Sequence, residues 1–276
     1  MTDFDPAAWT GRTEHCIDHL DPSHAGRVAL SLGQPVPAAG AALPPLWHWA
    51  FFVQGQPAPA LGPDGHPRGG DFLPPTGTLS RMWAGGRLEF HQPLRIGVPA
   101  QRRSVVRQVQ QKNGRTGPLL FVTVAHEYRQ DEVVCLTEEQ DIVYRQPAAP
   151  RLSGTEPAPP AQWQEQVDPD PVQLFRYSAV TFNGHRIHYD MPYARDVEGY
   201  PGLVVHGPLI ATRMVQAFLN SHPGARVTRL AFRGMRPLIA PRPFRVAGHL
   251  EAGHAARLWA EQDGMLAHTA EIGFAP

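Results

Sequence analysis

Apolar and polar positions divide the chain into two segments, and each runs from a helical pattern into strands. In the first segment, residues 82–145 contain four stretches that are rich in β-branched and aromatic residues and partly alternate apolar with polar positions. This pattern predicts four strands. The Asn-Gly pair within residues 112–115 predicts a hairpin turn between two of them.

The part of the chain before these strands has a helical pattern. Residues 6–33 predict two short helices, with Asp21 and Pro22 as a cap and first turn and Gly33 as a stop. The apolar run at residues 46–53, LWHWAFFV, follows two prolines. Its length fits a helix or a buried strand equally well, so both remain open.

Two stretches rich in proline separate the patterned segments. Residues 54–79 carry too many glycines and prolines for a regular element. A loop of this length in a compact domain indicates a functional lid, and the apolar pair Phe72 and Leu73 predicts that it packs. Residues 146–171 read as a Pro/Ala-rich linker. The sequence therefore predicts an N-terminal domain at 1–145 and a C-terminal domain at 172–276.

The second segment repeats the order of the first. A helix predicted at 208–220 precedes strand-like stretches that continue to the end of the chain. A local echo supports duplication, because Phe90-His-Gln-Pro-Leu94 resembles Phe232-Arg-Gly-Met-Arg-Pro-Leu238. We therefore predict an α+β fold with two antiparallel sheets, each wrapped around a central helix.

The most distinctive polar stretch lies at residues 183–190, NGHRIHYD, and is followed by GLVVHGP at 202–208. Pro208 suits the first turn of a helix because its missing N–H would have no partner there. Gly207 before it allows another group to approach the backbone. A helix beginning here would direct free N–H groups and its positive dipole end at a bound carbonyl, as an oxyanion hole requires.

Composition removes several classes of function. The 276 residues have no formal net charge and are 42% hydrophobic, so neither nucleic acid nor a membrane surface is expected as a partner. No uncharged apolar run approaches the ~18 residues of a membrane span, and no secretory signal is visible at the start. Two cysteines in unrelated contexts, Cys16 and Cys135, fit a reducing compartment, so a cytoplasmic protein is expected.

Familiar catalytic motifs are absent from the sequence. His185 and His188 are three residues apart with Asp190 nearby, but HExxH and cysteine ligand spacing are missing, so no metal is expected. No GxSxG, P-loop or GxGxxG occurs either. Serine hydrolysis and nucleotide binding are therefore not supported.

The two polar segments resemble the signature of the MaoC-like, type 2 enoyl-CoA hydratase family. That signature ends in aliphatic-His-x-Asp, matched here by Ile187, His188 and Asp190, and continues with a segment matched by 204–207, VVHG. In the first half PPLWHWAFF, LGPDGHPRGGDFLPP and RMWAGGRLEFHQPLRIG resemble the fatty-acid-synthase-type (HTD2-type) dehydratase branch, which includes mesaconyl-C4-CoA (3-methylfumaryl-CoA) hydratases. The resemblance implies a double hot-dog fold with its catalytic site in the C-terminal domain.

The family also implies reversible hydration of a short enoyl-CoA with no cofactor, and the branch points to mesaconyl-C4-CoA or a related dicarboxylyl-CoA. His188 suits the base because its unperturbed pKa of ~6.5 lies near working pH. The Gly207 N–H would stabilise the enolate, His206 would anchor the helix start, and Arg186 would pair with a substrate carboxylate. Two alternatives stay open, a hot-dog acyl-CoA thioesterase and a non-catalytic acyl-CoA-binding module.

The motif departs from the family pattern at positions 183 and 185. Asn183 stands where the family has its catalytic Asp, and His185 stands where it has Asn. An amide cannot donate and regain a proton as a carboxyl group can. Asn183 can therefore either orient water or serve as a turn residue, since Asn-Gly is itself a turn signal. Proton transfer then falls to His188, with Asp190 or His185 as further candidates.

Three arginines on a predicted strand are candidates for binding the CoA phosphates, because arginine pairs well with phosphate. They are Arg229, Arg233 and Arg236. A homodimer is expected, since two-fold association of chains is common.

Overall fold

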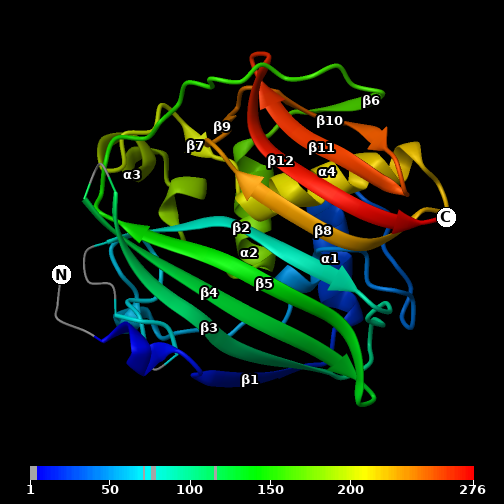
Figure 1. The fold of residues 1–276 in the computed structure, drawn as a ribbon, viewed down its shortest axis with the longest axis horizontal. Helices are drawn as coiled ribbons and strands as arrows, with labels where there is room; N and C mark the ends of the chain where they lie inside the picture. Colours follow the sequence, from blue (N-terminus) through cyan, green and yellow to red (C-terminus); the bar gives the residue numbers. More distant parts are fainter. Residues whose placement is uncertain (1–4, 71, 76–78, 115–116) are drawn as a thin grey trace.

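One ten-stranded antiparallel sheet forms the centre of the molecule. The structure, a computed structural model, describes residues 5–70, 72–75, 79–114 and 117–276. From edge to edge the strand order is β1-β3-β4-β5-β2-β8-β12-β11-β10-β6 (Figure 1). The predicted α+β class is confirmed.

Each half of the chain contributes five strands in the same topological order. The first half supplies β1 (Thr13–Asp18), β2 (Ser80–Phe90), β3 (Ala100–Gly114), β4 (Gly117–Gln130) and β5 (Val133–Arg145). The second supplies β6 (Trp163–Val167), β8 (Arg226–Gly234), β10 (Phe244–Glu251), β11 (Ala255–Gln262) and β12 (Met265–Ala275). Counted within each half, the order from the outer edge inwards is first, third, fourth, fifth and second strand. This repeated order agrees with the predicted duplication.

The two halves join where β2 pairs with β8. Leu88 lies opposite Leu230 in this pair, and both side chains are buried. Their separation along the chain equals that of Phe90 and Phe232 in the predicted repeat, so equivalent positions meet at the junction. The prediction of two separate sheets needs one correction. Backbone hydrogen bonds between β2 and β8 make the two halves a continuous sheet.

The strands predicted at 82–145 are confirmed as β2 to β5. The predicted hairpin is supported by the pairing of β3 with β4 up to Gly114 and Gly117. Its turn residues, 115 and 116, lie outside the described part of the chain.

The N-terminal helix prediction is half right. α1 (Pro22–Leu32) begins where the Asp21 carboxylate accepts a hydrogen bond from the His24 N–H at 2.8 Å, and it ends at Gly33 with φ 63°. Residues 13–18 form the edge strand β1 in place of the other predicted helix, after a single 3₁₀ turn η1 (Pro6–Trp9). Pairing with β3 decides this, because a short segment has little helical stability of its own.

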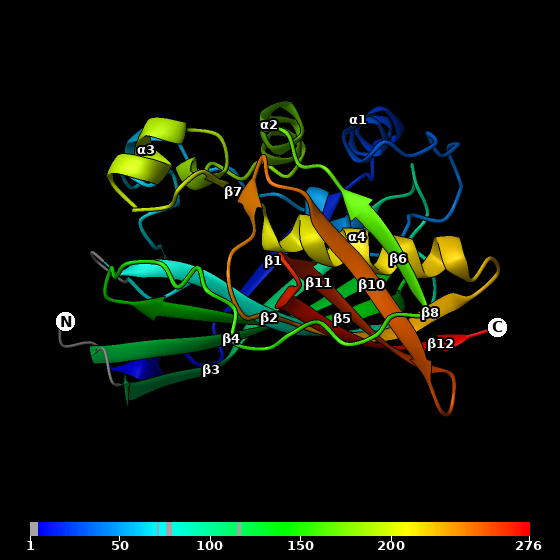
Figure 2. The same cartoon turned by 90° about the horizontal axis from the view of Figure 1, so that it is seen from above.

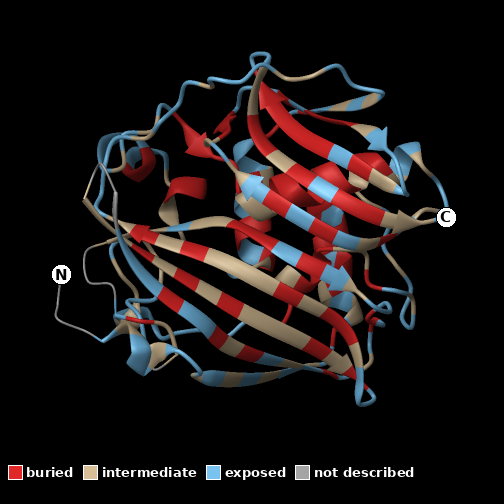
Figure 3. Ribbon diagram, in the orientation of Figure 1, coloured by how far each residue is buried: buried red, intermediate tan, exposed pale blue. Residues whose placement is uncertain are grey.

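Helices cover one face of the sheet in two layers (Figure 2). α4 (Gly207–Ser221) lies next to the sheet, and its apolar face, with Leu209, Met214 and Phe218, is buried (Figure 3). α1, α2 (Pro171–Val180) and α3 (Met191–Asp196) lie outside it. The helix predicted at 208–220 is confirmed as α4.

The first half has only the 3₁₀ turn η2 (Trp47–Ala50) where the second half has α4. A buried carboxylate, Glu138 on β5, anchors this turn. It accepts hydrogen bonds from Trp49 Nε1 at 2.8 Å and the Tyr128 hydroxyl at 2.9 Å, and lies 3.2 Å from His48 Nε2. Burial would raise the pKa of Glu138, but His48 first, and then His126 and Gln140, lower it to about 2. The polar cluster explains why residues 46–53 form neither a long helix nor a strand.

The remaining segments connect these layers. The predicted linker has no regular element until β6, whose Val167 pairs with Phe244 of β10. Within the predicted lid, η3 (Ala58–Ala60) precedes a bridge between Leu61 and Pro67. η4 (Arg186–His188) and the short pair β7 (Leu203–Val204) and β9 (Ile239–Ala240) lie near α3 and the start of α4. No helix in the described ranges is long and apolar enough to cross a membrane.

Candidate active site

His188 lies at the end of η4, beside the segment that opens α4. Its Nδ1 is 2.7 Å from the Val204 carbonyl oxygen. A carbonyl oxygen only accepts, so Nδ1 carries the proton and Nε2 keeps a lone pair. Burial lowers the pKa of His188 to about 4. The ring is therefore neutral near pH 7, with Nε2 ready to accept a proton.

The N-terminus of α4 faces the same region. Gly207 is the first residue of this 15-residue helix and Pro208 the second, and the His206 side chain forms no capping hydrogen bond. The N–H groups of Gly207 and Leu209 precede the first intrahelical donor, Ile210, which bonds to the His206 carbonyl. They point outward at the positive end of the helix dipole and can stabilise a negatively charged oxygen.

His206 anchors this helix start. Its ring is fully buried and stacks on His188, with 3.7 Å between ring centroids and an angle of 18° between planes. Its Nε2 lies 2.8 Å from the Ser178 hydroxyl oxygen on α2. Burial holds the pKa of His206 well below its ordinary value, so this ring is neutral. These contacts favour the anchoring role predicted from the sequence.

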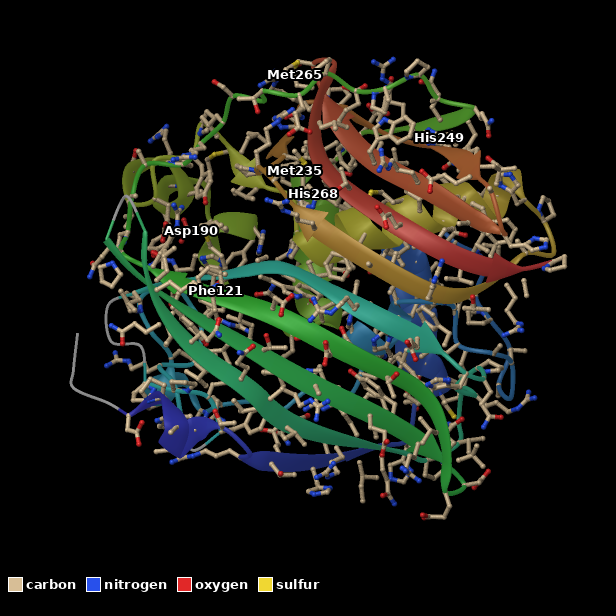
Figure 4. The ribbon with its side chains drawn as sticks, in the orientation of Figure 1. Phe121, Asp190, Met235, His249, Met265 and His268 are labelled. Atoms are coloured by element: carbon tan, nitrogen blue, oxygen red, sulfur yellow. The ribbon has the colours of Figure 1, made fainter. Side chains whose placement is uncertain are left out.

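The polar motif itself is fixed mainly by local hydrogen bonds. The Asn183 side-chain oxygen accepts from the His185 N–H at 3.0 Å, which leaves the amide NH₂ available to the pocket that Asn183 lines. Asp190 caps α3 by accepting from the Tyr193 N–H at 3.1 Å, and its other oxygen accepts from Arg186 at 2.8 and 2.9 Å. Both oxygens of Asp190 are thus engaged in hydrogen bonds. The catalytic role predicted for Asp190 remains a prediction. Figure 4 labels it beside α3.

The lid loop brings a second acid–base pair to the motif, which the sequence analysis missed. His66 Nδ1 donates to Asp64 Oδ2 at 3.0 Å, and the His66 backbone N–H donates to Asp64 Oδ1 at 3.0 Å. The His66 ring lies 4.1 Å from that of His185, centroid to centroid, and His185 lies 5.4 Å from His188. The available signal was the Asp-Gly-His triplet within the lid, but nothing local places it near residue 188.

These rings form a continuous row of imidazoles, His66, His185, His188 and His206. Burial, followed by the neighbouring rings of His66 and His188, lowers the pKa of His185 to about 2. Burial also lowers the pKa of His66, while Asp64 acts in the opposite direction. Burial raises the pKa of Asp64, but the hydrogen bonds and charge of His66, together with the charge of His185, lower it to about 2, so Asp64 keeps its charge.

One group within the described ranges has the composition of a metal site. Ligand atoms of Asp64, His66 and His185 lie within 4.8 Å of one another. Two histidines and a carboxylate are a donor set that binds divalent transition metals. His66 Nδ1 donates its proton to Asp64 Oδ2, so these two ligand atoms already bind each other without an ion. The expectation of no metal remains a prediction.

A pocket of about 460 Å³ opens beside the motif and is lined by the lid, α2 and β2. His66, Asn183, Ser178 and Arg81 contribute to its wall. The Arg81 Nε is buried and has no hydrogen-bond partner in the described part of the chain, and the guanidinium acts on the nearby Tyr144 by lowering the pKa of its hydroxyl against the effect of burial. Arg81, which the sequence analysis did not select, thus places a positive charge in the pocket.

Arg186 is engaged differently. Its Nη1 donates to the Pro63 carbonyl oxygen at 3.0 Å, and its Nε and Nη2 both donate to Asp190. Its guanidinium also lies over the Tyr193 ring, 4.1 Å from the centroid. The carboxylate role predicted for Arg186 would require it to exchange these partners.

The three arginines predicted to bind CoA lie apart from this pocket. Arg229 and Arg233 alternate with the buried Leu230 on β8 and so are exposed on the helix-free face of the sheet. Arg233 lines a hollow of about 960 Å³ there, which also includes Phe121 and Met235 (Figure 4). Arg236 donates to four backbone carbonyls of residues 152, 262, 265 and 266. CoA binding by these residues remains a prediction.

Known proteins resemble this chain over most of its length. The hydroxyacyl-thioester dehydratase type 2 family matches residues 46–240. A mesaconyl-C(4)-CoA hydratase of Chloroflexus aurantiacus is 48% identical over 251 residues, and the match covers 89% of this chain and 89% of that protein. A mitochondrial hydroxyacyl-thioester dehydratase type 2 of Schizosaccharomyces pombe is 27% identical, with 83% of this chain and 85% of that protein covered.

Solved structures show the same fold. A MaoC-like dehydratase from Phytophthora capsici superposes with a TM-score of 0.72 at 13% identity, covering 98% of this chain and 97% of that one. HtdX of Mycobacterium tuberculosis gives 0.68 at 17% identity, covering 96% and 100%. The predicted double hot-dog fold is confirmed. The sequence matches show that the chain is an acyl-thioester hydratase/dehydratase and belongs to the hydroxyacyl-thioester dehydratase type 2 family.

Proposed function

We propose that the enzyme reversibly hydrates mesaconyl-C4-CoA, or a closely related dicarboxylyl-CoA, without a metal or organic cofactor. The observation that carries the chemistry is a neutral His188, with its Nε2 lone pair free, beside the N-terminus of α4. The relative from Chloroflexus aurantiacus supports the choice of acyl group. The expected homodimer and cytoplasmic location stay predictions.

In the proposed hydration His188 Nε2 takes a proton from water as the water oxygen bonds to Cβ of the enoyl thioester. The π electrons move onto the thioester oxygen, where the Gly207 and Leu209 N–H groups stabilise the enolate. The Asn183 amide donates a hydrogen bond that orients the water. A proton then bonds to Cα, and the thioester remains intact. Dehydration is the reverse sequence.

Arg81 supports an acyl group with a free carboxylate. In mesaconyl-C4-CoA that carboxylate is attached to Cβ, the carbon that receives water. A guanidinium with an unpaired buried nitrogen in the pocket wall can bind it by charge-assisted hydrogen bonds. Arg186, by contrast, is already bound to Asp190 and to the lid. We therefore assign the carboxylate to Arg81 in preference to Arg186.

The test follows loss of enoyl-thioester absorbance with mesaconyl-C4-CoA and with crotonyl-CoA, for the wild type and His188→Gln. We expect hydration of the dicarboxylate-derived thioester, and a loss of about 10²–10⁴-fold in the variant, the usual contribution of a general base. Free CoA thiol is measured in parallel. Thiol release without hydration would refute the proposal in favour of a thioesterase, and binding without turnover would refute it in favour of a binding module.

A further inference from the structure

The motif alone lacks one member of the acid/base pair that the family uses. Hydration takes a proton from water and delivers a proton to Cα, and in a pair these two transfers are shared between two groups. His188 fills the first role in the proposed mechanism. Asn183, at the position of the family's Asp, cannot fill the second because a carboxamide is neither acidic nor basic enough to transfer a proton at neutral pH.

The lid supplies a candidate with suitable geometry. Asp64 binds His66 twice, through the ring Nδ1–H and through the backbone N–H, each at 3.0 Å. A carboxylate that holds one imidazole nitrogen fixes the tautomer and stabilises the imidazolium when the other nitrogen is protonated. His66 Nε2 is therefore the atom that can gain or donate a proton.

Backbone contacts fix this pair against the motif. The Arg186 N–H donates to the Asp64 carbonyl oxygen at 2.9 Å, and Arg186 Nη1 binds Pro63. Gly65 has φ +89°, and a Cβ there would lie 1.9 Å from the Gly184 carbonyl oxygen. A Cβ on Gly184 would in turn lie 2.8 Å from the Gly65 carbonyl oxygen. Both glycines are thus required for the loop and motif to touch.

The contact of the lid with the motif places His66 in the wall of the same pocket as Asn183. His185 separates it from His188, so the two proton-transfer candidates approach from different sides of one neutral ring. The charged and titratable groups that act on His66 are Asp64 and Glu198, which favour its protonation, and Arg81, which opposes it. A substrate carboxylate bound to Arg81 would offset that opposing charge.

We propose that His66, held by Asp64, is the second proton-transfer group of this enzyme. The proposal rests on the hydratase function above. In hydration the imidazolium of His66 gives its Nε2 proton to Cα of the enolate, while His188 holds the proton taken from water. Return of one proton from His188 to His66, through His185 or solvent, restores both rings. In dehydration His66 removes the Cα proton and His188 protonates the leaving hydroxyl group.

The test compares the wild type with His66→Gln and with a matched control, His91→Gln. His91 is an exposed histidine just after β2 and lies outside the pocket. We measure kcat and KM for hydration, and exchange of the Cα hydrogen of the hydroxyacyl thioester with D₂O by NMR. The comparison uses whichever of mesaconyl-C4-CoA and crotonyl-CoA the wild type hydrates, so a wrong acyl group does not decide the role of His66.

We expect His66→Gln to lower kcat about 100-fold, to leave KM within threefold and to stop Cα exchange, while His91→Gln behaves as the wild type. Asp64→Asn tests the positioning role. Without the carboxylate the imidazolium is less stable, so the basic limb of the kcat profile should move to lower pH. A kcat for His66→Gln within tenfold of the wild type, or continued Cα exchange, would overturn the proposal. So would inactivation by a chelator that zinc reverses, because it would assign Asp64, His66 and His185 to a metal.

Discussion

Gly65→Ala tests the contact between the lid and the motif with a single methyl group. The new Cβ would lie 1.9 Å from the Gly184 carbonyl oxygen, whereas real Cβ contacts are almost never under 3.0 Å. The loop must therefore move by roughly 1 Å or more, and Ala would also have to adopt the φ of +89°, which is unfavourable for an L-residue by ~1–2 kcal/mol. A misplacement of ~1 Å at catalytic groups can reduce the rate ~100-fold.

We expect Gly65→Ala to lower kcat by about two orders of magnitude, with little change in the thermal unfolding temperature. The loop contributes little to the buried core, so only the local position of Asp64 and His66 should change. Gly70→Ala is the matched control, since Gly70 lies in the same loop and its Cβ would meet nothing within 4 Å. Steady-state hydration kinetics and thermal melts measure both variants. A Gly65→Ala enzyme with kcat within threefold of the wild type would show that the contact is not required.

Three further predictions concern the pocket, the protonation of His188 and the packing of α4. Arg81→Gln should raise KM for mesaconyl-C4-CoA at least tenfold more than KM for crotonyl-CoA. Arg186→Gln, which loosens the lid and α3, should raise KM for both thioesters alike. The opposite pattern would assign the substrate carboxylate to Arg186. Burial lowers the pKa of His188 to about 4, so its neutral base form persists on acidification and the acidic limb of the kcat/KM profile should be centred near pH 4; an acidic limb centred near pH 6.5 would contradict this protonation state. Phe218→Ala should destabilise the fold by ~3–5 kcal/mol in denaturant titrations, because this ring is fully buried between α4 and the sheet, whereas Phe175→Ala on the exposed face of α2 should cost far less.

Features that depend on neighbouring residues were predictable from the sequence. α1 begins at Asp21 and ends at Gly33 because the cap and the left-handed glycine are local devices. α4 begins at Gly207 because Pro208 suits only a first turn. His188 and the start of α4 belong to one continuous stretch, so the motif predicted that they lie together, and they do.

Features that depend on distant partners were not predictable. Residues 13–18 form a strand only because β3 offers an edge to pair with. Arg81 enters the pocket through the register of β2, and Asp64 and His66 reach the motif through a loop whose Pro63 contacts Arg186, 123 residues away in sequence. Neither a propensity nor a short-range pattern carries that information.

The proposed second proton-transfer group, His66, comes from the first half of the chain, and a difference between the two halves accounts for this. The second half keeps the long helix α4, whose N-terminus lies beside His188. The first half has a single 3₁₀ turn at that place, held by Glu138, and continues directly into the lid. With no long helix at that place, the chain runs from the turn into the lid, and the first half supplies His66 and Arg81 to the pocket wall beside Ser178 and Asn183 of the second half. Either half alone would lack part of this wall, although both have the same strand order.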